Sequence, residues 1–482
     1  MNNIYYELNK QAKDNQVFTN LFSKIISDEN ILLAYQNIKN NIQYHISGID
    51  KITIKDINKL SKEELIQLIR QKIIYLKPNI LQQKQMYNKE LYISTIYDKI
   101  VQQCFKQILE PICEAHFSPH SYGNRPGRSY ENAIADIYNK INTIQLCYII
   151  NFNIYDLYKN INHSKLIKQL WTLGIRDTKV IYRIKTILKN KIQNKQYINQ
   201  PKQGIIQSGI LSNLLLNITL NEFDQWVEQR FEYFPTEYQY TTKGARIRAL
   251  KKESNLKEMY IIRYAEHIRI FCRTLDQAKR AKIAIMNWFK KRFKYIITDK
   301  QIFIINLKKK YDIFLGFKYK VLQRKKKYIA KSEIDNSNIS KIQSELKKQI
   351  INIQHAKFNI GQAIYVYNKI IKKIHNYYQF ATCVSINLKQ IDFIIKRIIK
   401  NRLRPAKNGK CISQKYKNSK QIRYIANMPI YPLSYIQFKI PIIKKLNYNY
   451  YEHKNKNEQY NLILYSLLSE KLYNCSMEYI IN

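Results

Sequence analysis

The chain has 482 residues, of which 45% are hydrophobic, so it is long enough for two or three domains with buried cores. Lys and Arg number 82 against 35 Asp and Glu, and the net charge of +47 exceeds what solubility alone requires. A protein this basic is expected to bind a polyanion, nucleic acid above all, although an AT-rich coding bias contributes to its Lys, Ile, Asn and Tyr content.

Cysteine usage and the distribution of apolar residues exclude several other classes of protein. The seven cysteines include no C-x-x-C pair, which argues against a disulfide framework or a zinc ribbon and favours a reducing compartment. Cys113, His116 and His120 lie close together in the sequence, but a structural zinc site needs a fourth ligand and none is evident. No apolar run approaches the roughly 18 residues of a membrane helix, and residues 1–16 resemble neither a signal peptide nor a transit peptide. We therefore expect a protein that has no membrane partner and is synthesised in the compartment in which it functions.

Hydrophobic periodicity predicts the order of the secondary structure elements. Stretches with helical spacing are residues 1–60, 61–115, 130–141, 181–192 and 277–293. Short apolar, β-rich runs are residues 147–155, 258–273 and 301–321, the second with a tight turn at Ala265–His267. Loops are expected at residues 117–129 and at the start of 204–227, which continues as a long helix, and the chain beyond residue 330 is helical and very basic. This alternation is typical of an α+β domain followed by an all-α domain.

Six motifs, in order along the chain, resemble those of group II intron-encoded reverse transcriptases and maturases. They are QILEPICEAHFSPHSYGNRPGRSYENAI, YIINFNIYDLYKNINHSKLIKQL, GIIQSGILSNLLLNITLNEFDQWV, IIRYAEHIRIFCRTLDQAKRA, FLGFKY, which matches a late core strand, and NKIIKKIHNYYQF. The resemblance implies a right-hand reverse-transcriptase fold of fingers and palm, followed by an all-α thumb called domain X. It divides the chain into a helical N-terminal extension of the fingers at 1–60, fingers and palm at 61–325, the thumb at 330–430 and a C-terminal tail at 431–482.

The resemblance also implies where a catalytic metal site would lie. In this family three Asp hold two Mg²⁺ ions, one on the strand of the second motif and two on the tight turn of the fourth. The corresponding residues here are Asn153, Glu266 and His267, so the formal charge falls from −3 to −1, and imidazole is a poor ligand for Mg²⁺. Asp156 is displaced from the site whether the strand continues beyond Asn153 or a helix begins. We therefore expect no catalytic residue, no bound metal and no other cofactor.

The implied nucleotide pocket is degenerate as well. The family's Pro-Gln-Gly-Gly loop corresponds to residues 206–209, in which Gln207 and Gly209 are retained. Ser208, however, adds a side chain where the backbone should approach a nucleotide. Lys89, in the segment KELYIST, stands where the family has an Arg that contacts the triphosphate. Changes at separate motifs favour genuine degeneration over a register error at one of them.

Two segments are candidates for RNA contact. Arg125 and Arg128 of the GNRPGRS motif are either loop cations on a solvated face or phosphate ligands, which the planar guanidinium suits. Residues 400–425 interleave cations with Tyr416 and Tyr424, a composition that fits phosphate contact and base stacking, with a solvated charge run as the alternative. The candidate contacts in this segment are Lys400, Arg402, Arg404, Lys407, Lys410, Lys415, Tyr416 and Lys417.

These features predict an RNA-binding maturase that assists splicing of a group II or derived intron without an intact catalytic metal site. Its partner would be intron RNA or unspliced precursor RNA, and no DNA endonuclease target is expected, because no His-Asn-His nuclease motif follows the thumb. One alternative is an active RNA-directed DNA polymerase, in which Glu266 and Asp156 would hold Mg²⁺. Another is a decaying relic, which the open frame and intact apolar patterning argue against. AT-rich coding favours an organelle-encoded protein, with a plastid as the first choice and a mitochondrion as the second.

Overall fold

The chain forms two compact units that both combine helices with sheets, which confirms the predicted mixture of α and β structure. The computed structural model describes residues 2–86, 89–154, 157–193, 197–206, 209–236, 238–253, 258–356, 359–407, 413–414, 416, 419–443 and 448–455. Among the described residues, unit 1 comprises 2–129, 150–304 and 448–455, and unit 2 comprises 130–149 and 305–443. Within the described part of the chain, no helix has both the length and the apolar composition of a membrane span.

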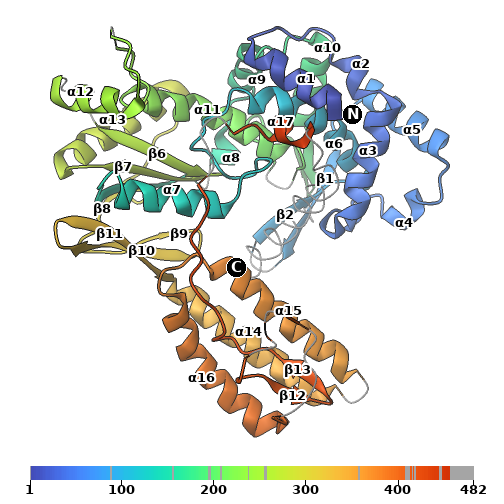
Figure 1. Cartoon of the computed structure of the whole chain (residues 1–482). Coiled ribbons are helices and arrows are strands. Elements are labelled where there is room, and N and C mark those ends of the chain that lie inside the picture. The colour runs from blue at the N-terminus through green and yellow to red at the C-terminus, as the bar shows by residue number, and fades with distance from the viewer. Residues whose placement is uncertain are drawn as a thin grey trace. The chain divides into compact units, whose positions relative to one another are not determined.

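The first part of unit 1 is mainly helical, as the periodicity predicted. Its helices are α1 (Asn2–Lys13), α2 (Phe22–Ile25), α3 (Asp28–Asn40), the 3-10 helix η1 (Ile42–His45), α4 (Ile54–Ile57), α5 (Lys62–Ile74) and α6 (Ile96–Glu114). A capping box formed by Ser61 and Glu64 begins α5, and the hydroxyl of Thr95 accepts the first-turn hydrogen bond of α6. Helix α6 is buried along most of its length and packs against α1 and α3 (Figure 1).

A small sheet interrupts this helical region in the order β2-β1-β4-β5. Its strands are β1 (Ile80–Met86), β2 (Lys89–Ile93), β4 (Lys191–Gln193) and β5 (Ile198–Asn199). Strands β1 and β2 form an antiparallel hairpin, and β4 joins β1 in parallel. The stretch 61–115 is therefore helical at both ends only.

The second sheet of unit 1, called the central sheet below, has the order β6-β7-β3-β8. Its strands are β3 (Tyr148–Asn153), β6 (Met259–Tyr264), β7 (His267–Cys272) and β8 (Ile302–Asn306). Strands β6 and β7 pair antiparallel with Tyr264 opposite His267, and Ala265 between them has a φ of 50°. The tight turn predicted from the sequence is thus confirmed.

Helices cover one face of the central sheet and orient the side chains at its edge. The remaining long helices of unit 1 are α9 (His163–Thr172), α10 (Thr178–Leu188), α11 (Ser212–Gln229), α12 (Lys243–Glu253) and α13 (Leu275–Phe293), and α8 (Leu157–Asn160) is a single turn. The ring centroid of Phe152 in β3 lies 6.2 Å from that of Phe223 in α11 and 5.1 Å from that of Phe289 in α13. Because successive side chains of a strand alternate between faces, Asn153 points away from these helices.

A short segment late in the sequence also belongs to unit 1. Helix α17 (Tyr450–Asn455) packs against α1. Asn449 Nδ2 donates a hydrogen bond to Asn9 Oδ1 at 2.8 Å, and Lys13 forms an ion pair of 2.8 Å with Glu452. The buried ring of Tyr451 anchors the segment.

Unit 2 contains three long helices that pack side by side (Figure 1). Its elements are α7 (Tyr130–Asn142), β9 (Asp312–Phe314), β10 (Phe317–Arg324), β11 (Lys327–Ile334), α14 (Asn336–His355), α15 (Ile360–Tyr378), α16 (Val384–Leu403), β12 (Arg423–Ile425) and β13 (Met428–Ile430). Helix α14 lies against both α15 and α16, and α15 lies against β13.

Two expectations for this region need correction. Residues 330–430 are not all-α, because β11 extends to Ile334 and β12 pairs with β13 around Ala426 and Asn427, both at positive φ. The FLGFKY motif is not one strand but a turn between β9 and β10, with Gly316 at a φ of 76°. A side chain at residue 316 would be strained at this φ, and a Cβ would lie 2.8 Å from the side-chain Nδ2 of Asn338, so glycine is favoured there.

Candidate functional site

The three residues implied as metal-site positions lie together where the two inner strands of the central sheet, β3 and β7, end and begin. Asn153 is the last residue of β3, Glu266 lies in the turn after β6, and His267 begins β7. His267 Nδ1 and Asn153 Oδ1 are 3.2 Å apart, with the amide oxygen as acceptor. The backbone amide of Ile154 donates to the carbonyl of Glu266 at 3.3 Å. The local geometry thus brings all three positions together, although the side chains differ from a carboxylate triad.

A buried arginine, not singled out by sequence reasoning, completes this group. Arg269 Nη1 donates to Asn153 Oδ1 at 3.1 Å, and the side chain is only 2% exposed. Arg269 lies two residues after His267 on the same strand, so both side chains point to the same face as Asn153. The alternating pattern of HIRIF could have revealed it, because Arg269 shares the face of His267 within an otherwise apolar strand.

The electrostatics of this group oppose a divalent cation. Burial, and secondarily the positive charge of Arg269, lowers the pKa of His267 from 6.5 to about 4, so the imidazole is neutral near pH 7. With Glu266 at −1 and Arg269 at +1, the formal charges of the group cancel. Hydrogen-bond donors surround Asn153 Oδ1, whereas Mg²⁺ requires oxygen ligands and favours carboxylates.

The described residues contain no group of three or more His, Cys, Asp or Glu side chains able to hold a metal ion. His120 of the Cys113–His120 cluster instead lies 3.1 Å from Glu232, and Cys113 is fully buried. Asp156, the alternative ligand considered from the sequence, lies outside the described residues.

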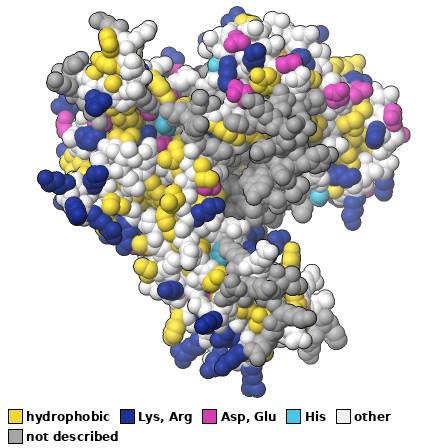
Figure 2. Space-filling view, in the orientation of Figure 1, with side chains coloured by type: hydrophobic (Ala, Val, Ile, Leu, Met, Phe, Trp, Pro, Cys, Tyr) yellow, Lys and Arg dark blue, Asp and Glu magenta, His cyan; other side chains and the backbone are white. Residues whose placement is uncertain are grey.

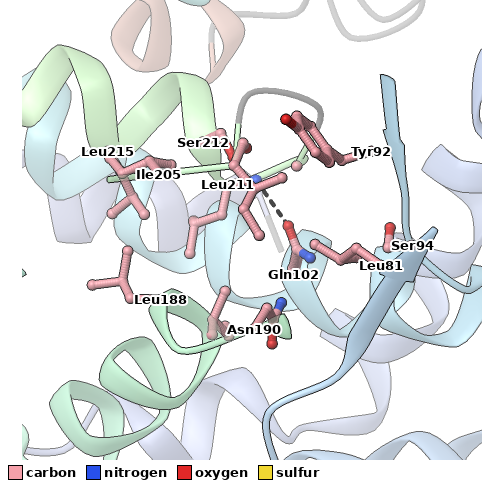
Figure 3. Close-up of a pocket in the computed structure, with 13 residues that line it drawn as sticks. Leu81, Tyr92, Ser94, Gln102, Leu188, Asn190, Ile205, Leu211, Ser212 and Leu215 are labelled. Carbon is pink, nitrogen blue, oxygen red and sulfur yellow. Dashed lines mark hydrogen bonds between the residues drawn. The ribbon is translucent and has the colours of Figure 1, made fainter. Parts of the chain in front are cut away.

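The loop implied as a nucleotide pocket borders a cavity of only about 20 Å³ (Figure 3). Gln207, Ser208 and the side chain of Lys89 lie outside what the structure describes. A Cβ at Gly209 would lie 2.5 Å from Ser212 Oγ, so glycine lets the Ser212 side chain approach the backbone there. Gln102 Oε1 accepts a weak hydrogen bond of 3.4 Å from the amide of Leu211, and leucine and isoleucine side chains line much of the rest. The cavity is large enough for a water molecule but far below the several hundred Å³ of a typical ligand pocket.

The two arginines of the GNRPGRS loop hold the loop together. Arg125 is buried, pairs with Glu114 at 2.8 Å and donates to the carbonyls of Ser118 and Ser121. The solvated-face alternative is therefore wrong for Arg125. Arg128 is half-buried and donates to the carbonyl of Pro119 at 2.7 Å, and burial followed by the charge of Arg125 lowers its pKa to about 10. Phosphate contact by either arginine stays a prediction and would require part of this network to open.

The cations at the end of α16 are exposed, as RNA contact would require. Figure 2 shows Lys and Arg side chains gathered over this end of unit 2. Lys400, Arg402, Arg404 and Lys407 are all exposed, and Arg402 also donates to Gln354 at 2.8 Å. The other predicted cations of this segment, Lys410, Lys415 and Lys417, lie outside the described residues.

The tyrosines of the same segment do not extend into solvent. Tyr416 is fully buried, stacks on Tyr431 with ring centroids 4.1 Å apart, and its hydroxyl lies 2.8 Å from His375 Nδ1. Tyr424, in β12, is buried as well. The expectation that Tyr416 stacks on RNA bases is therefore corrected, because its ring faces are occupied within the core of unit 2.

Comparison with known proteins identifies the family to which this arrangement belongs. The sequence profile of the family described as "Reverse transcriptase (RNA-dependent DNA polymerase)" matches residues 77–326, more than half of the chain. The chain belongs to this reverse transcriptase family. The matched residues include both sheets of unit 1, with Asn153, Glu266, His267 and Arg269 among them.

Individual relatives agree with the reverse transcriptase assignment. The chain is 31% identical over 226 residues to group II intron-encoded protein LtrA of Lactococcus lactis subsp. cremoris, covering 46% of this chain and 37% of that protein. It is 28% identical over 237 residues to an uncharacterized 91 kDa protein in a cob intron of Schizosaccharomyces pombe, covering 47% and 29% of the two chains. It is 27% identical over 137 residues to nuclear intron maturase 4, mitochondrial, of Arabidopsis thaliana, covering 28% and 16%. These likenesses confirm the predicted resemblance to reverse-transcriptase-like proteins of group II introns, although the chain spans well under half the length of these relatives.

Proposed function

We propose that this reverse-transcriptase-like chain is an RNA-binding maturase that assists splicing of a group II or derived intron and does not polymerise DNA. In this proposal the central sheet of unit 1 is the palm, the β1–β2 region belongs to the fingers, and the helices α14–α16 form the thumb. Intron RNA or unspliced precursor RNA is the partner. The names of the intron-encoded and maturase relatives support this choice.

The observation that carries the proposal is the loss of two of three carboxylates, together with hydrogen-bond donors directed at the amide oxygen of Asn153. The amide oxygen of Asn153 accepts hydrogen bonds from a neutral His267 and from the buried guanidinium of Arg269. Two Mg²⁺ ions carry a charge of +4, which a group of zero net charge does not offset. RNA binding needs no such site, because the exposed cations and a net charge of +47 supply the attraction to phosphates.

We further propose that the protein works in an organelle. The sequence favoured a plastid, but two relatives from Arabidopsis thaliana are named as mitochondrial intron maturases. We therefore give the mitochondrion at least equal standing with the plastid.

Primer extension distinguishes the maturase from the alternative, an active RNA-directed DNA polymerase. Purified chain is incubated with an RNA template, a DNA primer and Mg²⁺ or Mn²⁺, and no extended primer is expected. Extension by the wild-type chain that Glu266→Ala abolishes would overturn the proposal, because it would show that this carboxylate still holds metal.

A splicing assay tests the positive part of the proposal. Precursor RNA that contains the intron is incubated at low Mg²⁺ with increasing amounts of chain, and accelerated splicing is expected. The triple variant Lys400→Ala, Arg402→Ala, Arg404→Ala is the matched control and should accelerate splicing less. No acceleration at any protein concentration would contradict the maturase role.

A further inference from the structure

Unit 1 carries an aromatic groove on elements that the candidate metal site does not use. The groove lies between α9 and α10 and has a volume of about 520 Å³. Trp171 of α9 and Tyr182 of α10 line it together with Ile167 and Ile181. Trp171 is 44% exposed and Tyr182 is 62% exposed. Two large rings therefore face solvent beside one cavity.

The core of unit 1 does not require these rings. The inward faces of the two helices are already formed by buried aliphatic residues, namely Leu166, Leu170, Val180, Ile184 and Leu188. Trp and Tyr combine a large flat surface with a polar atom and are favoured where a protein meets a partner. Their position on the outward face thus points to a ligand with flat, partly apolar groups.

The charges around the groove identify the kind of ligand. Helices α9 and α10 contain no Asp or Glu. Of their cations, Lys165 pairs with Glu222 of α11 at 3.0 Å, and the others are Lys168, Lys179, Arg183 and Lys185. Lys168 and Lys185 line the groove and are exposed. The guanidinium of Arg176 lies 5.7 Å from the ring of Trp171. Asp177, between the helices, is buried as the N-cap of α10 and does not neutralise this surface.

We propose that this groove binds an unpaired stretch of the RNA, a function that rests on the RNA-binding role proposed above. Bases stack on Trp171 and Tyr182, and Lys168 and Lys185 contact the phosphates that flank them. Aromatic stacking suits any base, while lysines placed beside the rings follow the backbone. An apolar protein helix could also fill such a groove, but it would place no phosphate beside the lysines.

Tryptophan fluorescence tests the stacking directly. The chain has three tryptophans, of which Trp226 and Trp288 belong to an aromatic cluster with Phe223, so Trp171 is the one that a ligand in the groove would quench. The probes are an eight-nucleotide oligouridylate and a blunt RNA duplex of eight base pairs. We expect quenching by the single strand that exceeds quenching by the duplex, and its loss in Trp171→Phe.

Affinity measurements with matched variants test the energetic contribution. Trp171→Ala and Tyr182→Ala should each weaken oligouridylate binding by roughly 5- to 150-fold, the range known for base–aromatic stacking. Trp171→Phe should retain most of the affinity, because the phenyl ring still stacks. Tyr75→Ala is the control, since Tyr75 is a 75% exposed ring of unit 1 outside the groove and its loss should leave binding unchanged. The double variant Lys168→Ala, Lys185→Ala should reduce the slope of log affinity for oligouridylate against log salt concentration by about 1.4. This is the contribution of about 0.7 per phosphate contact on a single strand, for two contacts.

The outcomes separate this inference from the proposed function. One outcome is that the wild-type chain binds intron RNA, while Trp171→Ala and Tyr182→Ala bind intron RNA and oligouridylate as tightly as the wild type does. In that case the groove is not an RNA site, and a protein partner becomes the better occupant. If the wild-type chain binds no RNA, the proposed function fails and this inference fails with it. Circular dichroism of each alanine variant checks that the fold is retained, and Tyr182→Ala keeps the affinity test valid if Trp171→Ala does not fold.

Discussion

The perturbed pKa of His267 makes unit 1 sensitive to mild acid. Its pKa is about 4 in the folded chain, against 6.5 as the ordinary value. The unfolded chain therefore binds more protons than the folded chain between these pH values, so stability is fully present above pH 6.5 and is lost as the pH falls toward 4. Integrating this difference predicts that the free energy of unfolding falls by about 2 kcal/mol between pH 7 and pH 5. The full shift in the pKa of His267 corresponds to roughly 3 kcal/mol.

Urea unfolding followed by tryptophan fluorescence measures this loss in the right part of the molecule, because all three tryptophans belong to unit 1. His267→Asn is the comparison, since it can keep a donor toward Asn153 and does not titrate. We expect its free energy of unfolding to fall by about 2 kcal/mol less than that of the wild type between pH 7 and pH 5. Equal losses in both proteins, or a His267 ring that titrates near 6.5 by NMR, would refute the reasoning.

Three further results are expected. Asn153→Asp alone should not bind Mn²⁺, because the new carboxylate would pair with the guanidinium beside it; a bound-Mn²⁺ signal in EPR would contradict this account of the site. Replacing three exposed cations together by Ala, namely Lys400, Arg402 and Arg404, should reduce the slope of log affinity for RNA against log salt concentration by about 2. Thermal stability should not change. An unchanged slope would show that these three residues do not contact the RNA. Tyr416→Ala should destabilise unit 2 by about 3–5 kcal/mol, because the substitution leaves a cavity where a buried aromatic ring stood. Hydrogen exchange of the amides of α15 measures this loss. Weaker RNA binding with unaltered exchange would show that the ring acts at the surface instead.

The proximity of Asn153, Glu266 and His267 was predictable from the sequence because it depends largely on local structure. A tight turn between two β-rich runs determines where Glu266 and His267 lie, and the motif register determines which residue of β3 lies opposite. Arg269 was missed because its role depends on its neighbour in another strand. It is buried and bonded only because β7 pairs with β3, which periodicity within one strand does not reveal.

Among the candidate RNA contacts, too, features that depend on local sequence were predictable, and features that depend on distant residues were not. Exposure of Lys400 and Arg402 follows from their charge and from their position at the end of an amphipathic helix. The burial of Tyr416 depends on His375 and Tyr431, which are distant in sequence and adjacent only in the folded unit. Composition alone does not distinguish a tyrosine that stacks on RNA from one that packs beneath a basic surface.

The pairing of α1 with α17 also bears on how the protein is made. Asn9 and Asn449 are separated by 440 residues, and residues of unit 2 lie between them in the sequence. At typical rates of translation, roughly 20 to 90 seconds pass between the synthesis of these two partners. Throughout that interval α1 lacks the partner that α17 provides in the folded chain. The packing of α1 against α17 can therefore form only after residues 450–455 have been synthesised, so the N-terminal helix reaches its final surroundings late.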